Sequence, residues 1–324
     1  MPVTHQPTLM GSVTLPVSVE LRVVSPREHA PAVLGSVVPS QDPAADLLRK
    51  TIHTLPARQS LTDTSPCMFS VCKASEDICQ IRLNFDAFDI AQPNTKTLQS
   101  VHPQGRTQCQ NAQFTASSAG PASPTICGTN QAYHMILEAS DDCNMLNFNW
   151  VTNASPNNWN IHIMQISCTA KWKPPEGCLQ YYTGSTGFIQ SYNYAGGIHL
   201  ANQDYNNCIR TERNFCSMQY TQVATTDFSM SSTTASTSIT GDVCTDDYVV
   251  IQGGSTANVV TANFDRFCGT FLAATNGANA ASTIFTQRIP FELGVYTDGA
   301  EVDAAAAPTE ASAGFYIYYN QVAC

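Results

Sequence analysis

The residues of this chain with the clearest chemistry are its 13 cysteines, because paired thiols oxidise to disulfides. Five of them form an ordered set that occurs twice, with matching neighbours. The first set is Cys72, Cys79, Cys109, Cys127 and Cys168, and the second is Cys208, Cys216, Cys244, Cys268 and Cys324. These spacings are not the C-x-x-C of a metal or redox site, so we expect structural disulfides. Such bonds persist in an oxidising compartment, which predicts a secreted, extracellular protein.

Other side chains give little support for catalysis. The sequence contains no H-E-x-x-H, no G-x-S-x-G and no glycine-rich phosphate loop, and its 7 histidines are scattered. Each histidine is therefore expected to be a surface or packed residue. Charged residues make up 12% of the chain and the net charge is -10, which excludes the basic surface that nucleic acid or an anionic membrane requires. We predict that the protein is not an enzyme, and no run of about 18 apolar residues indicates a membrane span.

The two cysteine sets belong to a tandem repeat. The decapeptide WNIHIMQISC (159–168) aligns without a gap with FYIYYNQVAC (315–324). The segment KPPEG (173–177) separates the two copies, and its paired prolines predict a semi-rigid spacer. The predicted parts of the chain are an N-terminal arm (1–60), a first unit (61–173) and a second unit (174–324).

Each unit is expected to be all-β. Alternating apolar residues, which lie on one face of a strand, occur in both units. Examples are Ile81, Leu83 and Phe85 in the first unit and Phe291, Leu293 and Val295 in the second. Phe88 and Ile90 resume the first run after a slip of one residue, which predicts a β-bulge. No stretch of similar length has the period of an amphipathic helix, so the pattern predicts a disulfide-stapled β-sandwich in each unit.

The N-terminal arm has no cysteine but contains one alternating run. Its members are Val13, Leu15, Val17, Val19, Leu21 and Val23. This period of two predicts a half-buried strand at about 13–24, and Pro16, which has no N–H to donate, favours an edge position. The arm either folds back on its own chain or is donated to a neighbouring molecule.

Three polar segments favour surface loops. Thr115–Thr125 and Thr221–Gly241 are rich in Ser and Thr, so each is expected to be an exposed or an O-glycosylated loop. Asn153, in N-A-S, is an N-linked acceptor that would make the chain a glycoprotein, although Pro156 disfavours its use. The alternative for Asn153 is a simple turn residue.

Several motifs of the second unit occur in the order found in one known family. After the opening segment CLQYYTGSTGFIQSYNYAGGIHLANQDYNNCIR (178–210) come CTDDYVVI (244–251), FCGT and the closing GFYIYY. The second unit therefore resembles the CUB domain, most closely the version in secreted arthropod proteins with two such modules. The first unit is a divergent relative, because it lacks the opening cysteine and has Q-N-A-Q-F (110–114) where the family has x-x-D-Y.

The resemblance implies a jelly-roll-like β-sandwich and a set of disulfides. The family pattern joins Cys178 with Cys208 and Cys244 with Cys268, and Cys109 with Cys127 is the counterpart of the latter pair. Outside the usual four, matching positions in the two units suggest the pairs Cys79 with Cys168 and Cys216 with Cys324. The remaining cysteines are Cys67, Cys72 and Cys143, of which two are expected to bond and one to be free or to meet another chain.

The resemblance also implies a calcium site in the second unit. Many CUB domains hold Ca²⁺, which prefers several oxygen ligands, with a Glu, the Asp of C-x-x-D-Y and an Asp after the penultimate strand. Asp247 matches the second ligand and Asp298 the third, whereas a serine-rich run around Ser231 replaces the glutamate. The alternative is that both carboxylates serve in turns and loops. The first unit has Ala112 where Asp247 would align, so no site and no other cofactor is expected there.

Two functions fit a non-catalytic extracellular protein of this kind. The first is a structural protein that assembles with itself into a fibre or coat through strand donation by the arm. The second is a monomeric recognition module for a protein or a glycan, in defence or development. Five tyrosines early in the second unit offer a recognition surface, although strand packing explains them equally well. They are Tyr181, Tyr182, Tyr192, Tyr194 and Tyr205.

Overall fold

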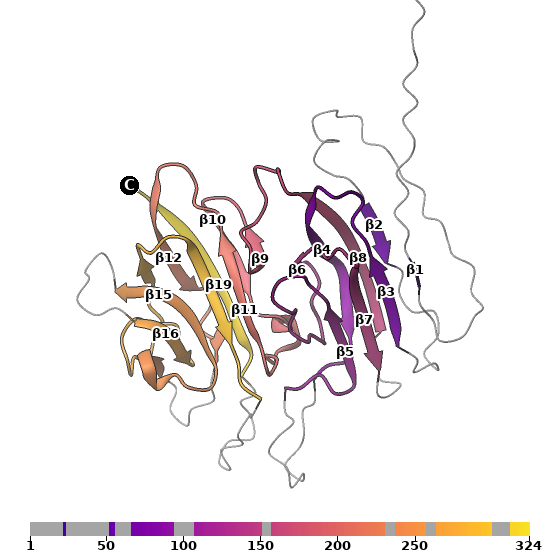
Figure 1. Cartoon of the computed structure of the whole chain (residues 1–324). Helices are drawn as coiled ribbons and strands as arrows, with labels where there is room; N and C mark the ends of the chain where they lie inside the picture. The colour runs from indigo at the N-terminus through magenta and orange to yellow at the C-terminus, as the bar shows by residue number, and fades with distance from the viewer. Residues whose placement is uncertain are drawn as a thin grey trace, which may run out of the picture.

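The computed structural model describes residues 22–23, 52–55, 66–93, 107–150, 157–230, 237–256, 264–299 and 312–324. These residues form two β-sandwiches that lie side by side (Figure 1). Besides strands, they contain two short 3₁₀ helices, η1 (Tyr194–Gly196) and η2 (Gly241–Val243), and no α-helix. The predicted all-β fold is therefore confirmed. Within the same ranges, no helix is long and apolar enough to cross a membrane.

The first sandwich consists of two four-stranded sheets, with the orders β1-β3-β7-β5 and β2-β8-β4-β6. The strands are β1 (Arg22–Val23), β2 (Ile52–Leu55), β3 (Cys67–Val71), β4 (Ile78–Ile90), β5 (Ala112–Ala116), β6 (His134–Glu138), β7 (Asn144–Trp150) and β8 (Asn157–Ser167). In β4, Leu83 and Phe85 are buried, and the register against β8 shifts between Phe85 and Ala87 before Phe88 is buried. The predicted bulge thus keeps the large apolar side chains of β4 in the core.

Aromatic rings fill the space between these two sheets. The ring centroids of Phe148 and Trp159 lie 4.2 Å apart in a stacked pair, and those of Phe114 and Phe148 lie 4.8 Å apart. Phe85 and Phe88 complete the cluster, and all five side chains are buried. Burying each such ring stabilises the fold by about 2 to 3 kcal/mol, so the core does not depend on the few charged residues.

The second sandwich has more strands in the same two-layer arrangement. They are β9 (Cys178–Tyr182), β10 (Thr186–Gln190), β11 (Asp204–Ile209), β12 (Phe215–Gln222), β13 (Phe228–Ser229), β14 (Ser238–Thr240), β15 (Tyr248–Thr256), β16 (Phe264–Gly269), β17 (Ile284–Thr286), β18 (Phe291–Tyr296) and β19 (Gly314–Ala323). One layer has the order β10-β19-β12-β17, and the other contains β9, β11, β18, β15, β16 and β14. β15 pairs with strands of both layers and joins them.

Two short strands of the arm extend the first sandwich. The predicted strand is described only at its end, where Val23 in β1 pairs antiparallel with Phe69 of β3. The rest of the run lies outside the described residues: Val13, Leu15, Val17, Val19 and Leu21. β2, which the sequence pattern did not predict, pairs antiparallel with β8, with Leu55 opposite Ile161. The described part of the arm therefore adds one strand to each sheet of its own chain.

Candidate functional site

Six disulfides occur in the structure. Five join the pairs expected from the resemblance and the repeat: Cys79–Cys168, Cys109–Cys127, Cys178–Cys208, Cys216–Cys324 and Cys244–Cys268. The sixth joins Cys72 to Cys143, and Cys67 takes part in none of the six. Cys72 follows β3 and Cys143 precedes β7, and these strands pair with Val71 opposite Asn144. In the second unit Cys208, the counterpart of Cys72, bonds to Cys178, which has no counterpart in the first unit. Cys72 bonds instead to Cys143, which the pairing of β3 with β7 brings close to it.

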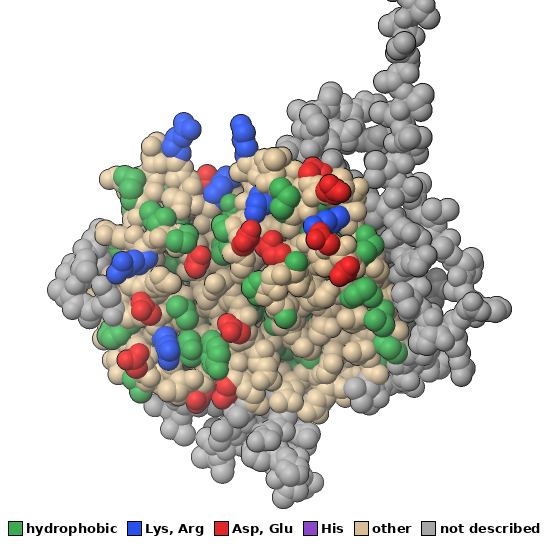
Figure 2. All heavy atoms as spheres, in the orientation of Figure 1, with side chains coloured by type: hydrophobic (Ala, Val, Ile, Leu, Met, Phe, Trp, Pro, Cys, Tyr) green, Lys and Arg blue, Asp and Glu red, His purple; other side chains and the backbone are tan. Residues whose placement is uncertain are grey.

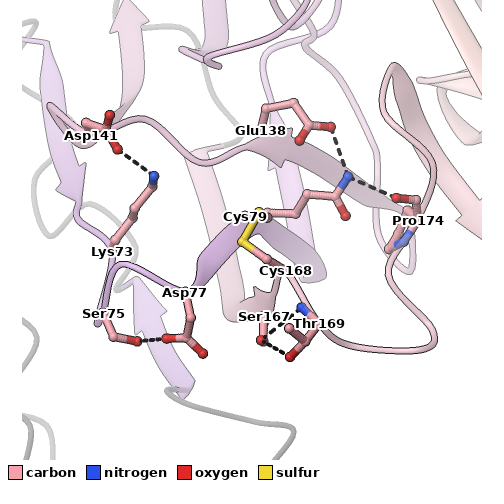
Figure 3. Close-up of a disulfide and its surroundings, with 11 residues drawn as sticks. Lys73, Ser75, Asp77, Cys79, Glu138, Asp141, Ser167, Cys168, Thr169 and Pro174 are labelled. Carbon is pink, nitrogen blue, oxygen red and sulfur yellow. Dashed lines mark hydrogen bonds and ion pairs between the residues drawn. A yellow bond between two sulfur atoms is a disulfide. The ribbon is translucent and has the colours of Figure 1, made fainter.

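The Cys79–Cys168 bond fastens the place where the chain leaves the first sandwich (Figure 3). The fully buried Gln80, next to Cys79 in the chain, donates from Nε2 to Glu138 Oε1 at 2.9 Å and to the Pro174 carbonyl at 3.1 Å. Pro174 belongs to the KPPEG segment. The segment lies between β8 and β9, and this hydrogen bond holds it against the first sandwich.

Two stacked tyrosines make reciprocal bonds across the seam between the sandwiches. Tyr133 Oη donates to the carbonyl of Ser191 at 2.8 Å, and Tyr192 Oη donates to the carbonyl of His134 at 2.9 Å. Their ring centroids lie 5.6 Å apart, and both side chains are buried. Burial raises the pKa of Tyr133 and of Tyr192 above the ordinary value, so both hydroxyls remain protonated donors at neutral pH.

Two buried asparagines form the centre of the same seam. The backbone N–H of Asn193 donates to Asn130 Oδ1 at 2.7 Å, and the backbone N–H of Thr129 donates to Asn193 Oδ1 at 2.8 Å. Asn193 has a left-handed backbone (φ 60°), which asparagine tolerates better than most residues. A Cβ on Gly128 would lie 2.0 Å from Asn193 Oδ1, so only glycine fits beside this amide. The seam is therefore specific in shape as well as in polarity.

His134 connects the edge strands of the two sandwiches. The backbone N–H of Tyr181 in β9 donates to Nε2 of His134 in β6 at 2.8 Å, and the imidazole packs edge-on against Tyr182. Burial, with the nearby charge of Arg82, lowers the pKa of His134 to about 3. The ring is neutral at physiological pH, with its proton on Nδ1, because Nε2 must keep a lone pair to accept this bond.

The five tyrosines predicted as a recognition surface mostly pack within the molecule. Tyr192 and Tyr205 are buried, while Tyr181 and Tyr182 lie in β9 beside the first sandwich and are partly buried. Tyr194, in η1, is partly exposed. Strand packing, the alternative left open by the sequence, accounts for four of the five. The sequence did not predict what covers these residues, because nothing local indicates that the first sandwich lies against β9.

A cavity of about 260 Å³ opens along this seam. Ile136 and Glu138 of β6 line one side, and Leu179 of β9 with Asp204 of β11 line the other. Both sandwiches contribute walls, so the shape of the cavity depends on the seam staying closed.

The two expected calcium ligands lie together in the second sandwich. The backbone N–H of Asp298 donates to Asp247 Oδ1 at 3.1 Å. Asp247 Oδ2 lies 3.9 Å from Nε2 of the buried His199, whose backbone N–H and Nδ1–H both donate to the Ser312 carbonyl at 2.8 Å. Across the described ranges, no three His, Cys, Asp or Glu side chains form a group that could hold a metal ion. An imidazole beside the carboxylate, in place of a further oxygen, does not fit Ca²⁺.

We therefore expect Asp247 to act as a loop carboxylate. The melting temperature of the protein should change by less than about 1 °C between EDTA and millimolar Ca²⁺, because a ligand stabilises a fold only by binding it. Differential scanning fluorimetry at several Ca²⁺ concentrations measures this. A rise in melting temperature that grows with the Ca²⁺ concentration would restore the calcium site.

The predicted loops and the glycan acceptor have mixed outcomes. Asn153 lies outside the described residues, as do residues 231–236 within the Ser- and Thr-rich Thr221–Gly241 segment. Parts of that segment are strands β12, β13 and β14, and Thr115 lies in β5. Glycosylation of the chain stays a prediction.

One group of exposed and partly exposed aromatic residues was not predicted. Phe188 in β10 is 48% exposed, and its ring contacts those of Tyr316 and Tyr318 in β19. The alternation of β19 contained the signal, because Phe315, Ile317 and Tyr319 on one face leave Tyr316 and Tyr318 on the other.

Comparisons with known proteins give one family match, which spans the second sandwich. The family model for the animal CUB domain matches residues 175–322. No curated protein matches the chain. Among solved structures, the CUB1-EGF-CUB2 domains of rat MASP-1 are 12% identical, with a TM-score of 0.28, over 83% of this chain and 97% of that one. The same domains of human MASP-1/3 are 12% identical, with a TM-score of 0.28, over 84% and 99%.

The third structure is the full extracellular region of zebrafish Gpr126/Adgrg6. It is 8% identical, with a TM-score of 0.28, over 84% of this chain and 32% of that one. These similarities are too low to carry any property of those proteins over to this chain.

Proposed function

We propose that this chain is a non-catalytic extracellular recognition protein whose two β-sandwiches act as one rigid binding unit. The observation that supports it is the seam, in which buried, directional hydrogen bonds join Tyr133 to Ser191, Tyr192 to His134 and Asn193 to Asn130. Two domains in a fixed arrangement bind a partner across both with a smaller loss of entropy than two flexibly linked domains do.

Other features agree with this proposal. Six disulfides and a CUB match over residues 175–322 are typical of extracellular interaction modules. On the face drawn in Figure 2, basic side chains are interspersed with acidic ones over a largely uncharged surface, without the broad basic area that binds nucleic acid. We infer that the partner is an extracellular protein or glycan.

Replacing Asn193 by alanine tests the rigid unit. Asn193→Ala removes the acceptor of the buried Thr129 N–H and the side chain best suited to φ 60°, so the free energy of unfolding should fall by about 3 kcal/mol. Small-angle X-ray scattering should show an extended, flexible particle for the variant and a compact one for the parent. Binding to an array of purified extracellular proteins should weaken in parallel.

Asn214→Ala is the matched control for this variant. Asn214 also has a left-handed backbone (φ 69°), but it is exposed in a turn of the second sandwich. Its replacement should cost only about 1 kcal/mol and leave the scattering profile unchanged. A parent protein that scatters as two flexibly tethered domains, or a partner that both variants bind with parental affinity, would contradict the rigid unit.

A second candidate function is self-assembly by exchange of the arm. The observation in its favour is that β1 and β2 pair at β3 and β8 as added edge strands, a pairing that a neighbouring molecule could also supply. If so, the full chain should elute as oligomers and a deletion of residues 1–30, which removes β1, as monomers. Size-exclusion chromatography with negative-stain microscopy measures this. A sharp monomer peak for both proteins at high concentration would exclude the assembly.

A further inference from the structure

The outward face of the β10-β19-β12-β17 layer carries a row of aromatic rings. Ile189 and Ile317 turn toward the core, whereas Phe188, Tyr316 and Tyr318 lie on the opposite face. Phe188 sits opposite Tyr318 in the register of β10 with β19. Residues opposite each other on paired strands lie on the same face of a sheet, so these rings form one surface.

The rings contact one another in sequence. The centroid of Tyr194 lies 5.7 Å from that of Tyr316, Tyr316 lies 5.2 Å from Phe188, and Phe188 lies 5.3 Å from Tyr318. The first two pairs are stacked, with interplanar angles of 28° and 21°. We name these four side chains (Tyr194, Tyr316, Phe188, Tyr318) the ring row. Phe188 is exposed and the three tyrosines are partly exposed, so the row is accessible from solvent.

No charged residue occurs in the four strands of the layer to which the ring row belongs. The strands read TGFIQ in β10, GFYIYYNQVA in β19, FCSMQYTQ in β12 and IFT in β17. The nearby Asp227 is 9% exposed, and its carboxylate accepts the hydroxyl of Tyr194 and the backbone N–H of Ala224 at 2.7 Å. This carboxylate is thus bound to the Tyr194 end of the row and is covered from solvent.

Neutral amides and hydroxyls surround the rings instead. Asn320 Nδ2 donates to Gln219 Oε1 at 3.2 Å, and the hydroxyls of Thr221 and Thr283 lie 2.9 Å apart. Thr221 lies beside Tyr318 in the pairing of β12 with β19. These groups both donate and accept hydrogen bonds without a net charge.

We propose that the ring row binds an uncharged oligosaccharide chain. The apolar C–H face of a pyranose ring matches an exposed aromatic face, while its equatorial hydroxyls match the flanking amides and hydroxyls. An anionic glycan would require a Lys or Arg, and none occurs in these four strands. A protein would dock on these rings mainly through apolar side chains, whereas the flanking amides and hydroxyls match the many hydroxyls of a sugar.

This inference rests on the proposed recognition function and names the ligand of one surface. Full-length protein is titrated with cellohexaose, maltohexaose and chitohexaose by isothermal calorimetry, at about 50 mM and about 500 mM NaCl to vary screening. At least one of these neutral hexasaccharides should bind, with the same affinity at both salt concentrations. Phe188→Ala and Tyr318→Ala should each weaken that binding by about tenfold or more.

Tyr296→Ala is the matched control. Tyr296 is 36% exposed and stacks on Tyr248 at 5.0 Å, but it lies in β18 of the other layer. Its replacement should leave sugar binding unchanged, and a parental melting temperature for Phe188→Ala shows that the variant is folded. The absence of binding by all three sugars, or equal binding by Phe188→Ala, overturns the proposal. Loss of a protein partner on Phe188→Ala, with no sugar bound, assigns the ring row to protein docking and overturns the glycan while leaving the recognition function intact.

Discussion

Replacing both Cys216 and Cys324 by serine should lower the free energy of unfolding by about 4 kcal/mol, because the bond closes a long loop of the unfolded chain. The two cysteines are 108 residues apart, the largest separation among the six disulfides. Both side chains are exposed, so the serines remove the cross-link and almost no packing. Urea unfolding of the oxidised parent and the double variant measures the difference.

Ala323→Ser is the control for the cysteine variant. Ala323 is exposed in β19 next to Cys324 and joins no cross-link, so its change should stay within about 0.5 kcal/mol. If the double cysteine variant unfolds at the parental urea concentration, the Cys216–Cys324 bond does not restrict the unfolded chain in the expected way. Its effect should also add to that of Asn193→Ala, since the two sites share no contact that would couple them.

The cysteines show how far repeat symmetry leads from sequence to structure. Five disulfides follow from the family pattern and the matching positions, because bonded cysteines occur at corresponding places in the two units. Cys72 does not follow, since its counterpart Cys208 bonds to a cysteine that the first unit lacks. Only the pairing of β3 with β7, which brings Val71 opposite Asn144, places Cys143 beside Cys72. Such proximity depends on the strand order of the sheet, which no local pattern records.

The seam was beyond sequence reasoning for a related physical reason. Alternation in a strand shows which side chains share a face, but not what covers that face. Tyr192 and Tyr205 therefore remained equally consistent with an exposed surface and with packing. At β10 and β19 the same alternation places Phe188, Tyr316 and Tyr318 outward, and no prediction was made for these three residues. The calcium expectation, which stays a prediction, depended on two aspartates, and the structure adds His199 beside Asp247, a neighbour that is distant in the sequence.

Acid should open the seam through His134. The pKa of this histidine is about 3 in the folded protein against an ordinary value of 6.5, so the unfolded chain binds its proton first as the pH falls. The stability contributed by the neutral ring is complete above pH 6.5. It should then decline by up to about 1.4 kcal/mol per pH unit between pH 6.5 and pH 3, which gives a loss of about 2 kcal/mol at pH 5.

His134→Gln separates this effect from every other titrating group. Glutamine does not titrate, and its Oε1 can accept the Tyr181 N–H that Nε2 of His134 accepts at 2.8 Å. Urea unfolding of both proteins from pH 8 to pH 5 should show a parental stability that falls more steeply than that of the variant, by about 2 kcal/mol over the range. Parallel curves would mean that His134 has the same pKa in the folded and the unfolded protein. The tyrosine and asparagine bonds would then hold the seam without a contribution from this ring. The parental stability should instead fall more steeply, and its scattering profile should expand near pH 5. Both results together would show that the contact of β6 with β9 opens first, because His134 bonds directly across it.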